Sequence, residues 1–343
     1  MRKLLNTLYI TSPDKYLALD GKNIVIYAEK KEIGRMPLHN LESIVTFGYS
    51  GVSPALMGAC VENNIFLYFM SQHGKFLAQV SGEMKGNVIL RKEQYRISDN
   101  EEKSCGIAKN IIIGKVFNSR WVLERMTRDY PMRIDVEHIK QISKTMNEIL
   151  KSISAASTLD ELRGLEGNAA SQYFSVFDNM ILQNKNDFYF HERNKRPPVD
   201  NVNAMLSFMY SILAGMAASA LSTVGLDPFV GFLHRDRPGR ISLALDIMEE
   251  LRSVLVDRFV LSLINKKVVS SNGFIKKENG AVIMTDDTKK TLLDAWQSRK
   301  QETIKHPFLE EKIQWGLVPY SQAMLLARYI RGDLDEYPPF MWK

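Results

Sequence analysis

The sequence predicts an α+β fold: a small N-terminal β-sandwich domain, followed by a large all-α domain with one inserted β-hairpin. Short β-branched runs separated by glycines fill the first ninety residues. Apolar residues recur at a helical period from Cys105 onward. A strand, Asn-Gly turn, strand pattern interrupts the helical part. We therefore expect a β domain at 1–91, a linker at 92–104 and a helical domain at 105–343.

The N-terminal elements follow from local composition. Runs rich in β-branched and aromatic residues predict strands at 43–47, 65–70 and 75–80, and the segment 19–27 predicts a turn followed by a strand. Ser53 is a suitable N-cap and Pro54 suits the first position of a helix, so a short helix is expected up to Glu62. Residues 92–104 are rich in charge and lack apolar periodicity, which indicates a linker or a long entry segment.

The helical part is predicted from apolar spacing. The first helix carries apolar residues near a 3.6-residue period between Ile107 and Leu123. A second helix is expected at about 134–155, and a third begins near Thr158. The hairpin is expected at 273–284, with its turn at Asn279-Gly280.

The segment from Asn201 to Leu226 carries no charge, which raises the alternative of a membrane span. Polar residues such as Asn203 and Ser211 are spread along it, and its alanines and glycine suit close contact between helices. We therefore expect a fully buried helix rather than a membrane span.

Composition restricts the class of protein. The 343 residues are 45% hydrophobic and 24% charged, which is ordinary for a globular protein and excludes disorder. Lys and Arg exceed Asp and Glu by 45 to 39, a net charge of +6 that mildly favours polyanionic partners. The two cysteines, Cys60 and Cys105, exclude a disulfide framework, and we expect buried free thiols in the cytoplasm.

His234 differs from the other five histidines because acidic residues follow it at a useful spacing. A Pro-Gly turn separates it from a helix that is expected to begin near Ser242. Asp246 and Glu249 lie three residues apart, so both project from one face of that helix. Carboxylates within an apolar stripe are costly unless a positive group meets them. A divalent metal would meet them, with His234 as a nitrogen ligand.

Three arginines crowd the same turn, namely Arg235, Arg237 and Arg240. Such a cluster suits a site that binds phosphate. It also supports an alternative, in which the two acids form ion pairs with these arginines and bind no metal. Spacing alone does not decide between the two.

Glu166 lies between two glycines in Gly164-Leu-Glu-Gly167, where small neighbours allow another backbone or a bulky substrate to approach. Taken by itself, an acid at this position is more often one that begins a helix, where the helix dipole favours negative charge.

Several motifs, taken in order, carry a family resemblance. They are Gly164–Ala170, Asn194–Tyr210, Gly225–His234, Leu243–Arg252, Gly86–Tyr95, the hairpin up to Thr285, and Tyr337–Phe340. The chain resembles the CRISPR-associated adaptation integrase–nucleases, the metal-dependent DNA enzymes that insert new spacers into CRISPR arrays. The similarity covers nearly the whole chain, and the form of the His234 motif is most similar to the type I-C branch. One departure is that Arg252-Ser253 stands where Arg-Pro often ends the acidic helix.

The resemblance implies the following site residues. Glu166, His234 and Glu249 would be the catalytic metal ligands for Mg²⁺ or Mn²⁺, and Asp246 matches a nearby acidic position that supports the site or a second ion. Arg235, Arg237 and Arg240 would hold the DNA backbone. Asn203 and Tyr173 are further DNA-binding candidates near the site, although Tyr173 suits the core equally well.

The resemblance also implies strand transfer, in which the 3′-hydroxyl of a DNA fragment attacks a phosphate of the array, and nuclease activity when water replaces that hydroxyl. It implies a homodimer formed through the β domains, bridged by a small ferredoxin-like adaptation partner. Two alternatives stay open. One is a non-catalytic DNA-binding scaffold, which the mild positive charge fits equally well, and the other is a metal-dependent nuclease unrelated to spacer acquisition.

Overall fold

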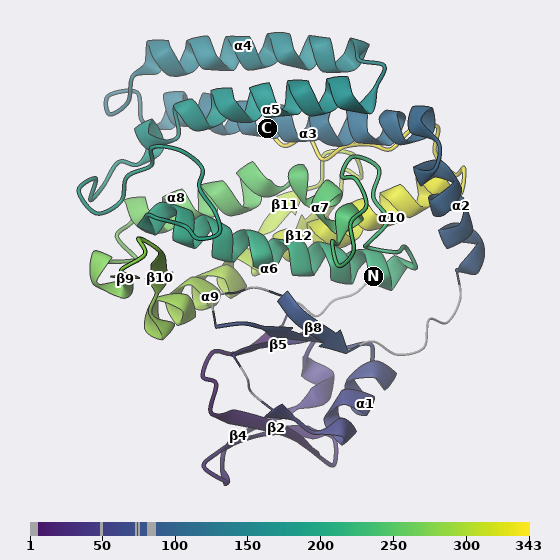
Figure 1. Cartoon of the computed structure of the whole chain (residues 1–343), viewed down its shortest axis with the longest axis vertical. Coiled ribbons are helices and arrows are strands. Elements are labelled where there is room, and N and C mark those ends of the chain that lie inside the picture. The colour runs from purple at the N-terminus through teal and green to yellow at the C-terminus, as the bar shows by residue number, and fades with distance from the viewer. Residues whose placement is uncertain (1–5, 49–50, 73, 75, 81–86) are drawn as a thin grey trace.

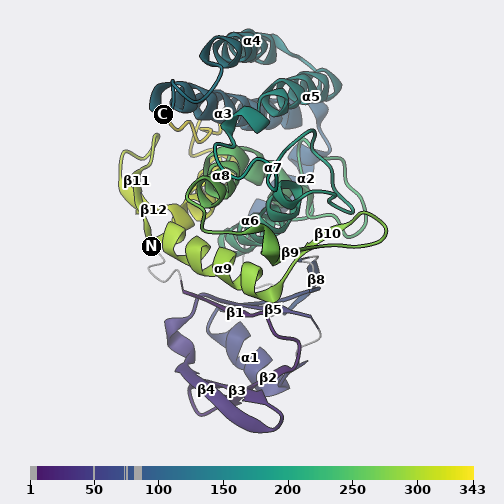
Figure 2. The same cartoon turned by 90° about the vertical axis from the view of Figure 1, so that its left-hand side faces the viewer.

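The computed structural model describes residues 6–48, 51–72, 74, 76–80 and 87–343. The strands of the N-terminal part lie at one end of the molecule, and the helices are stacked in layers above them (Figures 1 and 2). The predicted order, a β-rich part followed by a mostly helical part, is confirmed.

The N-terminal part contains two four-stranded sheets. One has the order β4-β3-β2-β6 and the other the order β1-β5-β7-β8, in which β1, β5 and β7 are parallel. The strands are β1 (Thr7–Ile10), β2 (Lys15–Asp20), β3 (Asn23–Ala28), β4 (Lys31–Pro37), β5 (Ser43–Phe47), β6 (Gly51–Val52), β7 (Phe66–Met70) and β8 (Phe76–Val80). The expected strand at 75–80 is present from Phe76, while Lys75 lies outside the described residues.

Helix α1 (Pro54–Glu62) leads from β6 to β7, and the Ser53 hydroxyl accepts a hydrogen bond from the Leu56 N–H, as the capping pattern predicts. The core between the two sheets includes Leu17, Ile44 and Leu56. Alternate residues of β5 and β7 point the other way, so that Phe47 joins the core of the helical part. Strands β5 and β7 of the sheet β1-β5-β7-β8 therefore contribute to both cores, and this sheet joins the two parts of the molecule.

The expected linker at 92–104 is wrong, because helices α2 (Val88–Ser98) and α3 (Glu101–Asp129) occupy nearly all of it. The buried face of α2 includes Gln94, whose amide donates to the carbonyls of Asp227 (2.8 Å) and Val230 (2.9 Å). Because Gln94 is polar although it is buried, α2 lacks the regular apolar period by which a helix is predicted from sequence. The start of α3 is capped by Asn100, whose side chain accepts from the Lys103 N–H.

The other helices form two layers (Figure 2). The outer layer contains α4 (Val136–Ala155) and α5 (Leu159–Ser175), both packed on α3. The inner layer contains α6 (Asn201–Val224), α7 (Ser242–Glu249), the π-helix η3 (Arg252–Asp257), α8 (Arg258–Asn265), α9 (Asp286–Gln301) and α10 (Val318–Ile330). Short 3₁₀ turns lie at Leu38–Asn40, Asp178–Met180, Ser271–Gly273 and Trp315–Leu317. Helix α3 contacts α5, α7 and η3, so side chains of all four elements can come together.

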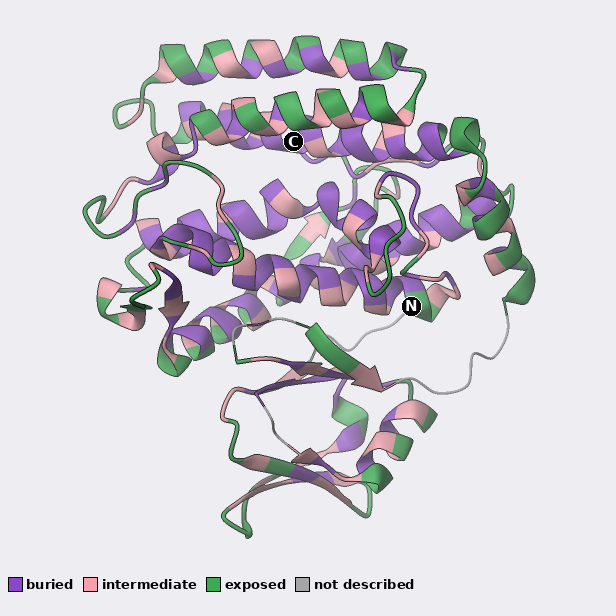
Figure 3. Ribbon diagram, viewed as in Figure 1, coloured by how far each residue is buried: buried purple, intermediate pink, exposed green. Residues whose placement is uncertain are grey.

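Helix α6 is the charge-free segment. By length and composition it could cross a membrane, and 72% of its most apolar window is buried inside the protein (Figure 3). It packs against α7, α8 and α10, in agreement with the expectation of a core helix.

The predicted hairpin is confirmed as β9 (Phe274–Lys276) and β10 (Val282–Met284), with Gly280 at a positive φ of 79°. A second two-stranded sheet, β11 (Thr303–Lys305) with β12 (Lys312–Gln314), was not expected. Its strands are three residues long, too short for a clear alternating pattern. Cys60 and Cys105 are buried free thiols, as expected.

Candidate metal and phosphate site

The acidic helix α7 begins at Ser242, after the Pro238-Gly239 turn, as predicted. Both of its acids lie inside the protein, with Asp246 0% and Glu249 4% exposed. Their partners differ, because Asp246 contacts the loop that carries His234, whereas Glu249 contacts basic side chains of neighbouring elements.

All four hydrogen bonds of Asp246 go to this loop. One oxygen accepts from the backbone N–H groups of Phe232 (2.7 Å) and Leu233 (3.0 Å). The other accepts from the N–H of His234 (3.1 Å) and from its ring nitrogen Nδ1 (2.6 Å). A carboxylate can only accept, so Nδ1 carries the proton and Nε2 remains available to a ligand. The expectation that Asp246 is itself a metal ligand is therefore not met, because its oxygens already hold the loop and orient His234.

Glu166 lies in the middle of α5, which begins at Leu159 with Thr158 as N-cap, so it is not a helix-start acid. Its carboxylate forms an ion pair with Lys115 of α3. The same Lys115 ammonium lies 2.7 Å from Oε2 of Glu249. Lys115 thus joins the acids of α5 and α7.

Glu249 has a second cationic partner, since Arg252 lies 2.8 Å from its Oε1, one turn further along the chain. Burial by itself raises the pKa of Glu249, but Arg252 and Lys115 lower it to about 2. Burial by itself lowers the pKa of Lys115, but Glu249 and Glu166 outweigh that effect and raise it. Glu249 and Lys115 are therefore both charged at neutral pH.

Glu166, His234 and Glu249 line one cavity of about 310 Å³. Its remaining lining residues are Arg163, Leu233, Arg235, Arg237 and Arg240. Arg235 and Arg237 are exposed at its rim, and Arg235 forms a 3.0 Å ion pair with Asp160. The close approach of Arg237 contributes, after burial, to a lowered pKa of Arg240. Six of the predicted site residues thus line one cavity, namely Glu166, His234, Glu249, Arg235, Arg237 and Arg240.

The chemistry of these side chains fits a hard divalent cation, because carboxylate oxygens and one imidazole nitrogen are suitable ligands for Mg²⁺ or Mn²⁺. The expected alternative of ion pairing also holds in part, although Lys115 and Arg252 are the partners rather than the three arginines of the turn. Across the described ranges, from residue 6 to 343 with their gaps, no three acidic, histidine or cysteine side chains close on a single point.

The two further DNA-binding candidates lie in the interior. Asn203 is 0% exposed, and its side chain bonds Arg193 (2.6 Å) and Asp200 (2.7 Å) at the start of α6. Tyr173 is 3% exposed and packs edge-on against Phe177. Neither side chain can reach a nucleic acid, so both expectations are corrected to roles in the core.

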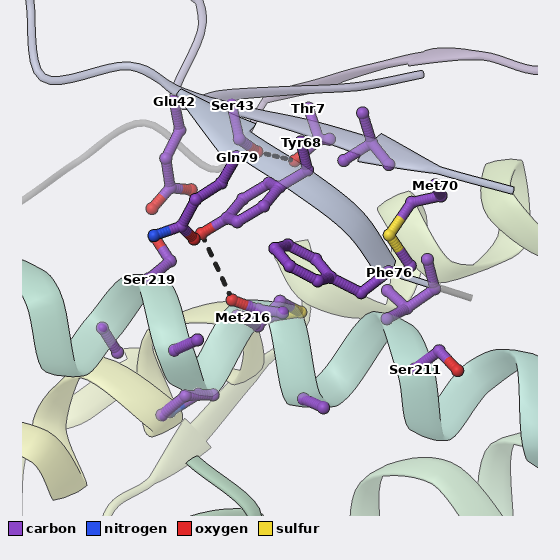
Figure 4. A pocket seen from close by; sticks show the side chains of 18 of the residues that line it. Thr7, Glu42, Ser43, Tyr68, Met70, Phe76, Gln79, Ser211, Met216 and Ser219 are labelled. Atoms are coloured by element: carbon purple, nitrogen blue, oxygen red, sulfur yellow. Dashed lines mark hydrogen bonds between the residues drawn. The ribbon is translucent and has the colours of Figure 1, made fainter. Parts of the chain in front are cut away.

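A different cavity, of about 180 Å³, lies between the second sheet and α6 (Figure 4). It is lined mainly by apolar and hydroxyl side chains, and the Tyr68 hydroxyl lies 3.4 Å from the Gly215 carbonyl oxygen at its wall. None of the predicted site residues lines this cavity.

Three basic residues of the site were missed from the sequence: Lys115, Arg163 and Arg252. Arg252 follows Glu249 by three residues, a spacing that could have indicated the ion pair. Arg163 donates to the Leu233 carbonyl (2.9 Å) beside His234. Lys115 is 51 residues from Glu166, and no local pattern connects them.

The chain is similar along most of its length to proteins of one family. A family model described as CRISPR associated protein Cas1 matches residues 8–298, which is most of the chain. The chain belongs to the Cas1 family. A CRISPR-associated endonuclease Cas1 from Chlorobaculum tepidum is 47% identical over 343 residues, with full coverage of both chains. Another, from Rhodospirillum rubrum, is 49% identical over 347 residues, again with full coverage of both.

Solved structures share the fold of this Cas1-family chain. A Cas1 protein from Thermotoga maritima matches with a TM-score of 0.81 over 96% of this chain and 97% of its own, at 22% identity. A casposase bound to its integration product matches with a TM-score of 0.84 over 99% of this chain and 95% of its own, also at 22% identity. The assignment to the type I-C branch stays a prediction.

Proposed function

We propose that this Cas1-family protein is a divalent-metal-dependent DNA endonuclease and integrase that joins the 3′-hydroxyl ends of foreign DNA fragments into a CRISPR array. The observation that carries the proposal is the shared cavity, whose lining includes Glu166, His234 and Glu249 together with four arginines. Membership of a family whose relatives are named CRISPR-associated endonucleases supports the reaction class. The fold likeness to a casposase bound to its integration product is consistent with strand transfer.

The side chains divide the work as follows. Glu166, His234 and Glu249 would hold Mg²⁺ or Mn²⁺, which when bound supplies a Lewis acid for the scissile phosphate. Asp246 positions His234 by accepting from its protonated ring nitrogen, from its backbone N–H and from the N–H groups of the two residues before it. Arg252 remains as a counter-charge on Glu249. In strand transfer one phosphodiester bond forms as another breaks, so the reaction needs no external energy source.

The mouth of the cavity binds the DNA backbone. Arg235 and Arg237 are exposed, and Arg240 lines the cavity just inside them. Guanidinium groups bind phosphate oxygens in a bidentate manner and carry no base preference by themselves. Binding should therefore be sensitive to salt and largely independent of sequence.

We extend the proposal to the assembly. The chain is expected to form a homodimer through its β domains and to bind a small ferredoxin-like adaptation partner. One similar chain, with a TM-score of 0.81 over 98% of this chain and 36% of its own, belongs to a Cas6-RT-Cas1–Cas2 complex. Size measurements on the chain with and without a Cas2-type protein test this part.

The central test compares Glu166→Ala, His234→Ala and Glu249→Ala with the wild type for Mn²⁺-dependent joining of 3′-hydroxyl ends to a repeat-containing target. Loss of joining with retained DNA binding is expected. Glu148→Ala, at an exposed position of α4, is the matched control and should keep full activity. Unchanged joining in all three variants would overturn the assigned site. DNA binding without any joining by the wild type would leave the DNA-binding scaffold as the better account. Cleavage without joining would favour a nuclease unrelated to spacer acquisition.

A further inference from the structure

Lys115 occupies the centre of the proposed ligand set. Its ammonium pairs with Glu166 and lies 2.7 Å from Glu249, although the three residues come from three different helices. Only 14% of the Lys115 side chain is exposed, and 5% of that of Glu249. This is a partly buried bridge between two acids that line the cavity, rather than a surface ion pair.

The bridge solves an electrostatic problem. Two carboxylates held this close repel each other strongly where water is scarce, and a cation between them removes the repulsion. Arg252 compensates Glu249 from its other oxygen, but it forms no ion pair with Glu166 in the described part of the chain. Lys115 is therefore the group that neutralises Glu166 and Glu249 together.

A divalent ion would need the same oxygens. An ammonium and a divalent ion at the same pair of carboxylates repel each other, so each weakens the binding of the other. The lysine side chain has a flexible stem of about four carbons, so its ammonium can leave the carboxylates while its backbone stays in α3. The ammonium can therefore move away and leave the two carboxylates, which are carried by other helices, to a divalent ion.

We propose that Lys115 is a built-in competitor for the divalent ion: it keeps Glu166 and Glu249 together before the ion binds, and it lowers the affinity of the site for that ion. This inference rests on the proposed function. It assigns Lys115 to positioning and to metal affinity, and it makes no demand on the chemical step itself. If the ion pair had a structural role alone, its removal would destabilise the protein, and the affinity for the metal would stay the same or fall.

The test uses the full-length protein with Lys115→Met and measures Mn²⁺ binding by calorimetry and thermal unfolding in EDTA and in Mn²⁺. Removing a competitor destabilises the metal-free state alone, so the melting temperature in EDTA should fall while Mn²⁺ binds about tenfold more tightly. Excess Mn²⁺ should restore the melting temperature. Lys103→Met, at an exposed position of the same helix, is the control and should change neither value.

Lys115→Gln removes the charge with less loss of polarity and serves if the methionine variant does not fold. Lys115→Arg keeps the charge and should bind Mn²⁺ no more tightly than the wild type. Equal or weaker Mn²⁺ binding by both neutral variants would overturn the inference, even if Glu166→Ala and His234→Ala abolish binding. Absence of Mn²⁺ binding by the wild type would instead overturn the proposed function on which the inference rests.

Discussion

The carboxylate of Asp246, on the acidic helix, lies 2.6 Å from Nδ1 of His234, on the loop that precedes this helix. The bond determines which ring nitrogen carries the proton. Because Asp246 also accepts three backbone N–H groups of the loop, the ring and the loop are fixed by one side chain. The orientation of His234 in the proposed metal site therefore depends on Asp246.

Replacing Asp246 with Asn should weaken metal binding. The amide nitrogen cannot accept, so at least one of these bonds is lost and His234 is no longer held in one orientation. We expect Mn²⁺ affinity to fall by about 10- to 100-fold, the usual effect of losing such an orienting group. Calorimetric titration measures it. Asp236→Asn, an exposed acid of the same loop, makes the same change in charge and should leave the affinity intact.

The arginines at the cavity mouth should control DNA affinity through charge. Arg237→Ala and Arg240→Ala are each expected to weaken binding uniformly across sequences. Each should also reduce the slope of log affinity against log salt by about one. Fluorescence anisotropy at several salt concentrations gives both quantities. Arg331→Ala, outside the cavity lining, should change neither, and a preserved slope in the first two variants would contradict the proposed DNA path.

Lys300 of α9 makes stability depend on pH. It is 2% exposed and donates to the Thr7 hydroxyl (3.0 Å), and burial lowers its pKa from 10.5 to about 8. Between those values the unfolded chain binds more protons than the folded one, so the free energy of unfolding rises with pH. The contribution is complete above 10.5 and is lost as the pH falls through 8.

Lys300→Met should remove this dependence, so the stability of the wild type relative to the variant should rise by on the order of 2 kcal/mol from pH 8 to 10.5. Urea unfolding at a series of pH values measures the difference. Lys305→Met, at an exposed position nearby in sequence, should leave the pH profile unchanged. A parallel pair of profiles for the wild type and Lys300→Met would refute the assignment.

Asn118 of α3 should be essential for stability. This residue is 0% exposed and makes three hydrogen bonds: to the carbonyls of Glu250 and Phe340, both at 2.7 Å, and from the N–H of Trp342 at 2.8 Å. Asn118→Ala leaves these groups without partners and should cost about 2–4 kcal/mol. Asn110→Ala removes a single bond to the C-terminal segment and should cost about 1 kcal/mol or less. Chemical denaturation compares the two.

The sequence was most informative where the relevant residues are close along the chain. Asp246, Glu249 and His234 follow a local pattern, and the structure brings them together. Glu166 was identified through family resemblance, because an acid in the middle of α5 has no local signature of its function. Lys115 could not be found this way, since its partners lie on other helices and only packing brings them together.

The fold shows the same limit. Strands and capped helices with clear patterns were predicted within a few residues, including α1 and the hairpin of β9 and β10. Helix α2 was missed because Gln94 satisfies its buried amide through backbone atoms 133 and 136 residues away. Asn203 and Tyr173 were misplaced for the same reason, because polar side chains in the interior depend on partners that a local pattern does not reveal.

The chain segment around Phe340 has a consequence for biosynthesis. Glu250, the neighbour of the proposed ligand Glu249, accepts from the Tyr337 hydroxyl and from the Phe340 N–H, both at 2.5 Å, and Phe340 follows it by 90 residues. A ribosome must therefore translate almost the whole printed sequence before the support beneath the acidic helix can assemble. A nascent chain that lacks this segment would leave Glu250 without these two partners, directly beside the proposed ligand Glu249.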